Sequence, residues 1–264
     1  MSRVRVTARP TRQSRTRSRA ALDSETPHIA PARRSAFGRK LRAWYRANAR
    51  DLPWRQTRDP YRVLVSELML QQTQVSRVLT YYQEFLTRFP TLVHLARARP
   101  AQVREAWEGL GYYARARNLH RLAREVTGAG WDPAQPLPSE PATLRTLPGI
   151  GAYTAGAVAS FAYERRAELV DTNVARVLRR VFDPDLDAKS SRGQKTLWNL
   201  ARHLLPRTGR ESWTHNQALM ELGALICTAR IARCGECPVR RECETGKASG
   251  ERRAARGEGG GGLE

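Results

Sequence analysis

Hydrophobic positions recur at helical spacing through most of the chain. Between residues 60 and 90 the apolar side chains fall three or four positions apart, or at sums of these, and they include Leu64, Leu68, Val75, Leu79, Tyr82 and Leu86. This period places them on one face of an amphipathic helix. Residues 101–126, 196–205 and 216–227 repeat the pattern, the first with breaks at Gly109 and Gly111. Because no long stretch alternates as a strand would, the pattern predicts an all-α fold.

The two ends depart from this pattern. Residues 1–34 contain nine arginines against Asp23 and Glu25, and almost no large apolar side chains. Such a segment cannot offset its ordering entropy by burial, so we expect a disordered basic tail that follows nucleic-acid phosphates. Its Arg- and Ser-rich composition also suits a transit peptide, which is the alternative. We expect residues 247–264 to form a second flexible tail.

The charge balance narrows the class of partner. The chain carries 46 Lys and Arg against 25 Asp and Glu, a formal net charge of +21. Such an excess points to a polyanion, most simply nucleic acid, with an anionic membrane surface as the competing target. No apolar run is long enough to span a bilayer, and no signal-peptide pattern opens the chain. We therefore expect a soluble, nucleic-acid-binding protein with no membrane partner.

A glycine-containing turn lies in the sequence LPGIGAYTAGAV, residues 147–158. We expect Ser139 to cap a short helix ending near Leu147, and a second helix to start near Ala152. The turn residues are Pro148, Gly149, Ile150 and Gly151. Its glycines permit positive φ and close backbone approach, and the N–H groups of the second helix face outward at the positive end of its dipole. This predicts a helix-hairpin-helix that contacts DNA phosphates; an ordinary αα-turn is the alternative.

All four cysteines lie close together, at Cys227, Cys234, Cys237 and Cys243. A disulfide framework would need an oxidising compartment and cysteines spread through the domain, and neither is indicated. Four thiolates on one loop suit an iron–sulfur cluster or a tetrahedral zinc ion, and the spacing does not separate the two. The arginines around them, Arg230, Arg233, Arg240 and Arg241, suggest that the loop also faces phosphate, with a solvated basic surface as the alternative.

Two carboxylates stand in apolar surroundings. Glu67 lies in VLVSELML, where we expect half burial and a raised pKa that suits a general acid, unless it is a surface residue. Asp171 follows an apolar pair and opens a helix, so it is a candidate N-cap whose carboxylate stays ionised and faces a developing cation. A raised acid paired with a depressed one is typical of glycosidic bond cleavage.

Together these motifs resemble a known family. The hairpin, the aspartate in VDTNVARVL and the cysteine loop are similar to the helix-hairpin-helix (HhH-GPD, endonuclease III-like) DNA glycosylases, which carry a [4Fe–4S] cluster. Within that superfamily, LPWR, SELMLQQTQV, GLGYYARARNLH and NQALMELGALICT resemble the MutY-type adenine glycosylases, and the match covers about residues 37–245. The resemblance implies two lobes: a six-helix barrel with the hairpin (56–166), and a cluster lobe (35–55 and 167–246).

The resemblance also implies residue roles. Glu67 matches the acid that protonates adenine N7 and then helps to activate water, and Asp171 matches the carboxylate that stabilises the C1′ cation, oriented by Asn173. Tyr153 stands where bifunctional relatives have a nucleophilic lysine, so we expect a monofunctional enzyme that releases adenine paired with 8-oxoguanine or guanine. The remaining matches are the base-pocket residues Trp54, Arg55 and Gln217, the duplex-wedging residues Gln72 and Tyr112, and the four cysteines as cluster ligands.

Two departures from the family keep alternatives open. The sequence continues only about twenty residues past Cys243, without the C-terminal domain that reads 8-oxoguanine in typical MutY enzymes, and Thr172 replaces a common glycine. Relatives that remove thymine or uracil mispaired with guanine are therefore the alternative. A lesion-binding module without activity and a zinc-bound structural protein are rivals from other classes. We expect a monomer acting on mismatched or damaged double-stranded DNA in the cytoplasm of a bacterium, at the nucleoid.

Overall fold

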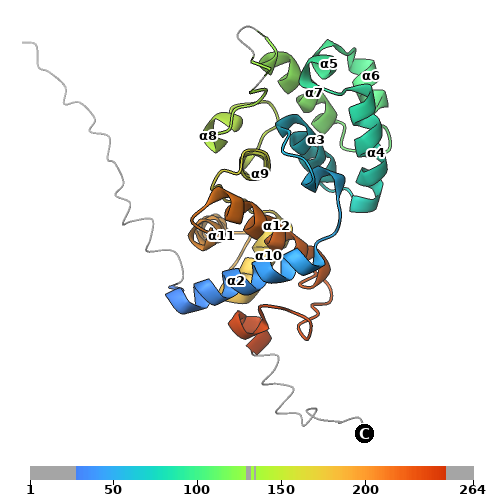
Figure 1. Cartoon of the computed structure of the whole chain (residues 1–264). Coiled ribbons are helices and arrows are strands. Elements are labelled where there is room, and N and C mark those ends of the chain that lie inside the picture. The colour runs from blue at the N-terminus through green and yellow to red at the C-terminus, as the bar shows by residue number, and fades with distance from the viewer. Residues whose placement is uncertain (1–27, 129–131, 134, 248–264) are drawn as a thin grey trace, which may run out of the picture.

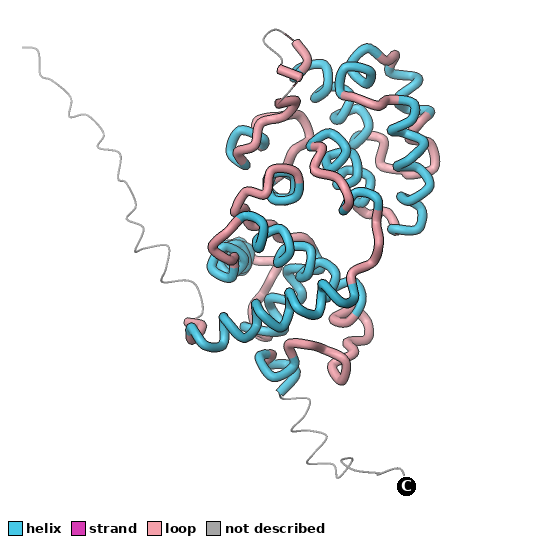
Figure 2. The backbone as a smooth tube through the Cα atoms, in the orientation of Figure 1, coloured by secondary structure: helices cyan, strands magenta, loops and turns pink. Residues whose placement is uncertain are grey.

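The computed structural model describes residues 28–128, 132–133 and 135–247, and this part of the chain is helical (Figures 1 and 2). It contains no strand, only an isolated antiparallel bridge between Cys227 and Ala232. The elements are α2 (Pro31–Asn48), η1 (Pro53–Arg55), α3 (Pro60–Leu70), α4 (Val75–Arg88), α5 (Leu92–Arg97), α6 (Pro100–Glu105), α7 (Ala114–Val126), α8 (Pro141–Leu144), α9 (Ala152–Phe161), α10 (Thr172–Phe182), α11 (Ser191–Leu204), α12 (Gly209–Leu225) and η2 (Arg240–Glu242). The all-α prediction is confirmed.

The helices form two groups, which Figure 1 shows one above the other. In the upper group α3 packs against α4, α7 and α9, while α5 and α6 pack against α7. In the lower group α12 packs against both α2 and α10, so the first described helix joins the last ones. Helix α9 also contacts α12. The chain passes between the groups after α2 and after α9, which places η1 and the start of α10 at the junction.

Side-chain caps fix where several helices begin. Asp59 accepts hydrogen bonds from the backbone N–H groups of Tyr61 and Arg62, and so starts α3. Asp171 accepts one from Val174 N–H and starts α10, as predicted for an N-cap. None of the described helices is both long enough and apolar enough to cross a membrane. The caps matter for function because α3 carries Glu67 and α10 begins at Asp171.

The N-terminal tail is shorter than predicted. We expected disorder through residue 34, but α2 begins at Pro31. The Arg33 guanidinium donates to the carbonyl oxygens of Val181 (2.8 Å) and Glu242 (2.7 Å), and it pairs with the Glu244 carboxylate at 2.7 Å. These partners order a segment whose composition alone suggested none. Residues 1–27 lie outside the described residues, and so does the predicted tail 247–264 except for Lys247, which ends a helical turn.

The hairpin forms, but two details differ from the prediction. Glu140 precedes α8, and the Ser139 hydroxyl accepts a hydrogen bond from Arg165 (2.9 Å) instead of capping the helix. The second helix, α9, begins at Ala152 as predicted. Gly149 has φ 76°, and a Cβ there would lie 2.6 Å from the Asn118 Cβ, so glycine is required. Gly151 has φ −86°, so it needs no left-handed conformation; open space surrounds it.

Candidate active site

A cavity of about 490 Å³ lies at the junction of the two helix groups. Its lining comes from the segment containing η1, from α3 and the loop after it, from α9, from the start of α10 and from α12. The predicted site residues that share it are Trp54, Arg55, Glu67, Gln72, Tyr153, Asp171, Asn173 and Gln217. Tyr112, the hairpin turn and the four cysteines do not line it. The fold thus joins the predicted catalytic and base-pocket residues from five segments of the chain.

Glu67 is the buried acid of this cavity. It lies in α3, is only 3% exposed, and its Oε2 accepts a hydrogen bond from the Tyr153 hydroxyl at 2.7 Å. Burial raises the pKa of the Glu67 carboxyl to about 7; the Tyr153 hydrogen bond opposes this and the charge of Asp171 adds to it. The residue is more deeply buried than the half burial we expected. At neutral pH a large fraction of Glu67 carries a proton that it can donate.

Tyr153 lies in the first turn of α9, directly after the hairpin. Besides Glu67, its hydroxyl contacts the Met220 sulfur at 3.8 Å. Burial raises the pKa of the Tyr153 phenol well above its ordinary value, and the neighbouring Glu67 and Asp171 carboxylates act in the same direction. The phenol therefore stays protonated and acts as a hydrogen-bond donor.

Asp171 is held by two donors at the start of α10. Its Oδ1 accepts from Val174 N–H at 2.7 Å and its Oδ2 from the Asn173 amide at 2.9 Å, so Asn173 orients it. We expected these contacts to depress its pKa, and this was wrong in direction. Burial raises the pKa of the Asp171 carboxyl, and the hydrogen bonds and the nearby Arg176 only partly offset that effect.

An ion-pair network of Arg50, Arg55 and Glu221 also lines the cavity. Glu221 of α12 has no exposed side-chain surface, and its carboxylate pairs with Arg50 and Arg55, each at 2.7 Å. These two guanidiniums lower the pKa of Glu221 to about 2 against the effect of burial. Arg55 also donates to the Gln217 Oε1 at 3.0 Å. The sequence reasoning missed Arg50 and Glu221, although an acidic residue inside the apolar run ALMELGAL was a usable signal.

The predicted wedge residues lie on two adjoining loops. Gln72 follows α3 and Tyr112 precedes α7, and both have left-handed backbone conformations, with φ 56° and 47°. Tyr112 is 61% exposed, although by residue type it would pass as a core aromatic. Trp54, in contrast, is 6% exposed and packs edge-on against Tyr82. In the hairpin turn Pro148 and Ile150 are buried, and Gly149 and Gly151 are exposed.

The four cysteines meet at a second, small cavity of about 30 Å³, which they line with apolar neighbours from α10 and α12. Two sulfurs receive hydrogen bonds, Cys227 from Arg180 (3.4 Å) and Cys243 from Gly246 N–H (3.3 Å). Convergent thiols with N–H donors fit a thiolate-bound iron–sulfur cluster. Within the described residues, no three His, Cys, Asp or Glu side chains lie so that they could hold a metal ion as they stand.

One arginine links the cysteine loop to the candidate catalytic aspartate. Arg176 donates to the Cys227 carbonyl and to the Asn173 Oδ1, both at 2.7 Å. Among the arginines predicted to face phosphate, Arg230, Arg233 and Arg241 are exposed and Arg240 is partly exposed. Arg233 also pairs with Glu236 at 3.4 Å, so part of its charge is used within the loop.

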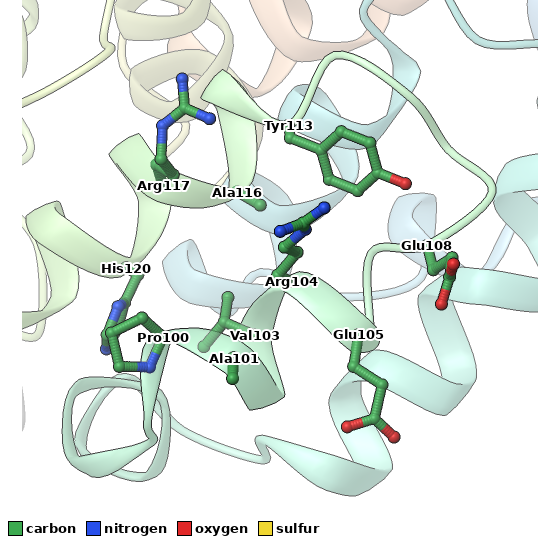
Figure 3. Close-up of a pocket in the computed structure, with 10 residues that line it drawn as sticks. All are labelled: Pro100, Ala101, Val103, Arg104, Glu105, Glu108, Tyr113, Ala116, Arg117 and His120. Carbon is green, nitrogen blue, oxygen red and sulfur yellow. The ribbon is translucent and has the colours of Figure 1, made fainter.

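A larger cavity, of about 750 Å³, lies between α6 and α7. Figure 3 shows Arg104 and Tyr113 over its apolar floor, with His120 beside Pro100 at one end. None of the predicted site residues lines it. Its lining mixes charged and apolar side chains, most of them exposed or partly exposed. We therefore assign the active site to the smaller cavity, which contains Glu67 and Asp171, the carboxyls whose pKa values burial raises.

Comparison with known proteins agrees with this geometry. Residues 65–203 match the family described as HhH-GPD superfamily base excision DNA repair protein. The adenine DNA glycosylase of Rattus norvegicus is 43% identical over 230 residues, 83% of this chain and 43% of that protein. The enzyme of the same name from Mycobacterium tuberculosis (strain H37Rv) is 43% identical over 220 residues, 81% of this chain and 70% of that protein. The chain thus spans less than half the length of its rat relative.

Solved structures show the same fold. A thermostable thymine-DNA glycosylase superposes with a TM-score of 0.73 at 29% identity, covering 82% of this chain and 98% of that one. A non-covalent endonuclease III–DNA complex superposes with a TM-score of 0.68 at 21% identity, covering 85% of this chain and 100% of that one, which supports the fold alone. By its sequence match and its architecture, this chain belongs to the HhH-GPD superfamily of base excision DNA repair proteins.

Proposed function

We propose that the chain is a monofunctional DNA N-glycosylase that hydrolyses the N-glycosidic bond of adenine mispaired with 8-oxoguanine or guanine. The observation that carries the proposal is the pairing of Glu67 with Tyr153 at 2.7 Å, in the same cavity as Asp171. The adenine DNA glycosylase relatives support the choice of base. A protein that only bound lesions would have no need of a proton-donating carboxyl beside a second carboxylate.

The chemistry follows from the two carboxyls. Protonated Glu67 donates to adenine N7, which makes the base a better leaving group and weakens the bond to C1′. Positive charge then develops at C1′, where ionised Asp171 stabilises it. Glu67, now a carboxylate, accepts a proton from the attacking water. The base leaves, water supplies the new C1′–O bond, and the product is an abasic site with an intact strand.

The identity of residue 153 supports a monofunctional reaction. A Schiff-base mechanism needs an amine that forms a covalent bond to C1′ and then promotes strand cleavage. The Tyr153 phenol cannot form an imine, and its strongly raised pKa disfavours the phenolate as a nucleophile. Its role in this proposal is to hold the Glu67 carboxyl in place.

The proposed partner is double-stranded DNA, bound by a monomer. The net charge of +21 favours phosphate binding, and the hairpin presents the start of α9 at an exposed turn. An intact duplex hides the glycosidic bond, so the nucleotide must rotate into the cavity, and we expect Gln72 and Tyr112 to fill the gap that it leaves. In a bacterium this chain would work on the nucleoid, in the cytoplasm.

For the cysteine loop we propose a [4Fe–4S] cluster bound by Cys227, Cys234, Cys237 and Cys243. The resemblance to the HhH-GPD glycosylases implies this group, and the four cysteines that line one small cavity support it. When bound, the cluster would crosslink the loop and supply redox chemistry. Purified protein should contain iron and sulfide in equal amounts and show visible absorbance. The Cys243→Ser variant should lose the iron, the sulfide and the absorbance. Zinc in place of iron would contradict this assignment.

The thymine-DNA glycosylase structure, at 29% identity, favours one alternative: release of thymine or uracil mispaired with guanine. A single-turnover assay separates the candidates, using duplexes with adenine opposite 8-oxoguanine, adenine opposite guanine, and thymine or uracil opposite guanine. We expect adenine release, with strand breaks only after alkali. Release of thymine or uracil alone would move the chain to the alternative, and breaks without alkali would contradict the monofunctional mechanism.

A further inference from the structure

Arg115 of α7 is a buried cation whose partners are almost all backbone carbonyls. The side chain is 8% exposed, and in the described part of the chain no carboxylate pairs with it. One nitrogen, NH1, donates to the carbonyls of Leu68 (2.8 Å), Met69 (2.9 Å) and Gln71; the other, NH2, donates to Leu110 (3.0 Å), Gly111 (3.1 Å) and the Thr73 hydroxyl (3.2 Å). A single guanidinium therefore joins the loop after α3 to the loop before α7.

Two of these carbonyls occupy special positions. Gln71 and Gly111 directly precede Gln72 and Tyr112, the non-glycine residues with positive φ in these two loops. Left-handed conformations are uncommon for such residues and persist only where the surroundings fix them. The carbonyl of the preceding residue belongs to the peptide plane on the N-terminal side of the φ bond. A hydrogen bond to that carbonyl therefore fixes the orientation of this plane and restrains φ. The Arg115 guanidinium also lies over the Tyr112 ring, with its Cζ 5.4 Å from the ring centroid, and this contact restrains the Tyr112 side chain.

We propose that Arg115 is a positioning residue that holds Gln72 and Tyr112 together in the conformation needed to displace a nucleotide from the duplex. The proposal relies on the proposed function for the role of these two residues in DNA. Because the guanidinium orders both loops before DNA arrives, binding does not have to supply the ordering entropy. Arg115 touches neither the base nor the catalytic carboxyls, so its effect is on extrusion of the nucleotide and not on bond cleavage.

The geometry requires arginine and not merely a positive charge. The guanidinium is planar, with donors in a fixed fork, so NH1 can serve the end of α3 and the loop after it while NH2 reaches Thr73 and the loop before α7. A lysine ammonium is a compact charge on a flexible stem and cannot keep both sets of carbonyls. Arg115→Lys should therefore separate the two loops while keeping the charge. Arg121→Lys is the matched control, because Arg121 lies on the same helix but is exposed and, among the described residues, forms an ion pair with Glu125.

The experiment measures nucleotide extrusion directly. A duplex carries 2-aminopurine in place of the target adenine, and its fluorescence rises when the base leaves the stack. We expect Arg115→Lys to bind the duplex nearly as well as wild type but to lose most of the fluorescence rise, and to release adenine from a paired duplex about 100-fold more slowly. Adenine opposite an abasic site is easier to extrude, and there the loss should be much smaller.

A second variant guards against a folding defect. Thr73→Val removes one acceptor from the first loop and leaves the guanidinium in place, so it should show a weaker loss of the same kind with unchanged thermal unfolding. Equal losses on both duplexes, or a full fluorescence rise in Arg115→Lys, would overturn the proposal. Failure of the proposed function would look different: wild type would release no adenine, while the fluorescence comparison would still test Arg115.

Discussion

Glu67 and Glu221 line the same cavity from different helices, and both are buried, yet the direction of their pKa shifts differs. The pKa of Glu67 is raised to about 7, whereas that of Glu221 is lowered to about 2. In the described part of the chain Glu67 accepts from one neutral side-chain donor, the Tyr153 hydroxyl, while Glu221 is paired with two guanidiniums. The comparison teaches that burial alone does not decide the state of an acid. The side of the cavity formed by α3 and α9 therefore carries a carboxyl that can be protonated near neutral pH. The side formed by α12 and the segment containing η1 carries an ionised carboxylate in an ion-pair network, which we call the ionic frame.

The first two tests make the same change, glutamate to glutamine, at Glu67 and at Glu221, and the larger effect is expected at Glu67. Glu67→Gln keeps the shape and still accepts from Tyr153, but it has no acidic proton. We expect base release to fall by about 10² to 10⁴-fold, the usual contribution of a general acid, with thermal unfolding unchanged. Single-turnover kinetics at neutral pH measure the first quantity. Activity near the wild-type level would show that Glu67 is not the proton donor.

At Glu221 the same exchange should act on stability. Glu221→Gln leaves the largely buried Arg55 without its counter-charge, so we expect a loss of about 3 kcal/mol in the free energy of unfolding, measured by denaturant titration. Glu105→Gln is the control, because its pair with Arg88 is exposed and screened by solvent, so its loss should leave the free energy of unfolding nearly unchanged. If Glu221→Gln proved as stable as Glu105→Gln, the ionic frame would be unimportant.

The third test changes the pKa of Glu67 without removing it. The Tyr153 hydroxyl stabilises the ionised carboxylate, so Tyr153→Phe should raise the pKa of Glu67 further above about 7. Base release requires the protonated acid and declines as pH rises through this pKa; the declining limb should therefore move to higher pH. Tyr163→Phe is the control, because that hydroxyl donates to Leu137 and not to a carboxylate. A shift toward lower pH would contradict the assigned hydrogen bond.

Local chemistry explains what the sequence could predict of this site. Helical spacing, the turn glycines and the cap at Asp171 depend on neighbours along the chain, and the structure confirms the all-α fold, the hairpin start at Ala152 and the cap. The resemblance to HhH-GPD glycosylases identified Glu67 and Tyr153, which lie 86 positions apart and meet only in the folded chain. No periodicity would have paired them.

The predictions that were wrong concern residues whose structure or pKa depends on partners far away in the sequence. Residues 31–34 read as disordered by composition, yet Arg33 finds carbonyl partners more than 140 positions away. Ser139 reads as a cap but accepts from Arg165. Asp171 reads as a depressed acid because hydrogen bonds to a carboxylate lower its pKa, but the degree of burial, which reverses the direction, comes from the packing of α10 at the junction.

The smallest expected effect concerns Asp171, which combines properties of Glu67 and Glu221. As for Glu67, burial raises the pKa of Asp171. Like Glu221, Asp171 accepts hydrogen bonds from several donors, one of them Asn173. Asn173→Ala removes that donor, so the pKa of Asp171 should rise further. Base release requires Asp171 ionised; the limb at low pH should therefore move upward, while the limb set by Glu67 stays in place.

At neutral pH this variant should lose about tenfold in rate, which corresponds to about 1.5 kcal/mol, the lower end of the contribution of one hydrogen bond to a charged group. The pH profile measures both limbs in one experiment and separates the two acids. Movement of the high-pH limb alone would mean that Asn173 acts on Glu67. Since Asn173 also accepts from Arg176, which holds the Cys227 carbonyl, loss of iron from the variant would show instead that the cysteine loop had been disturbed.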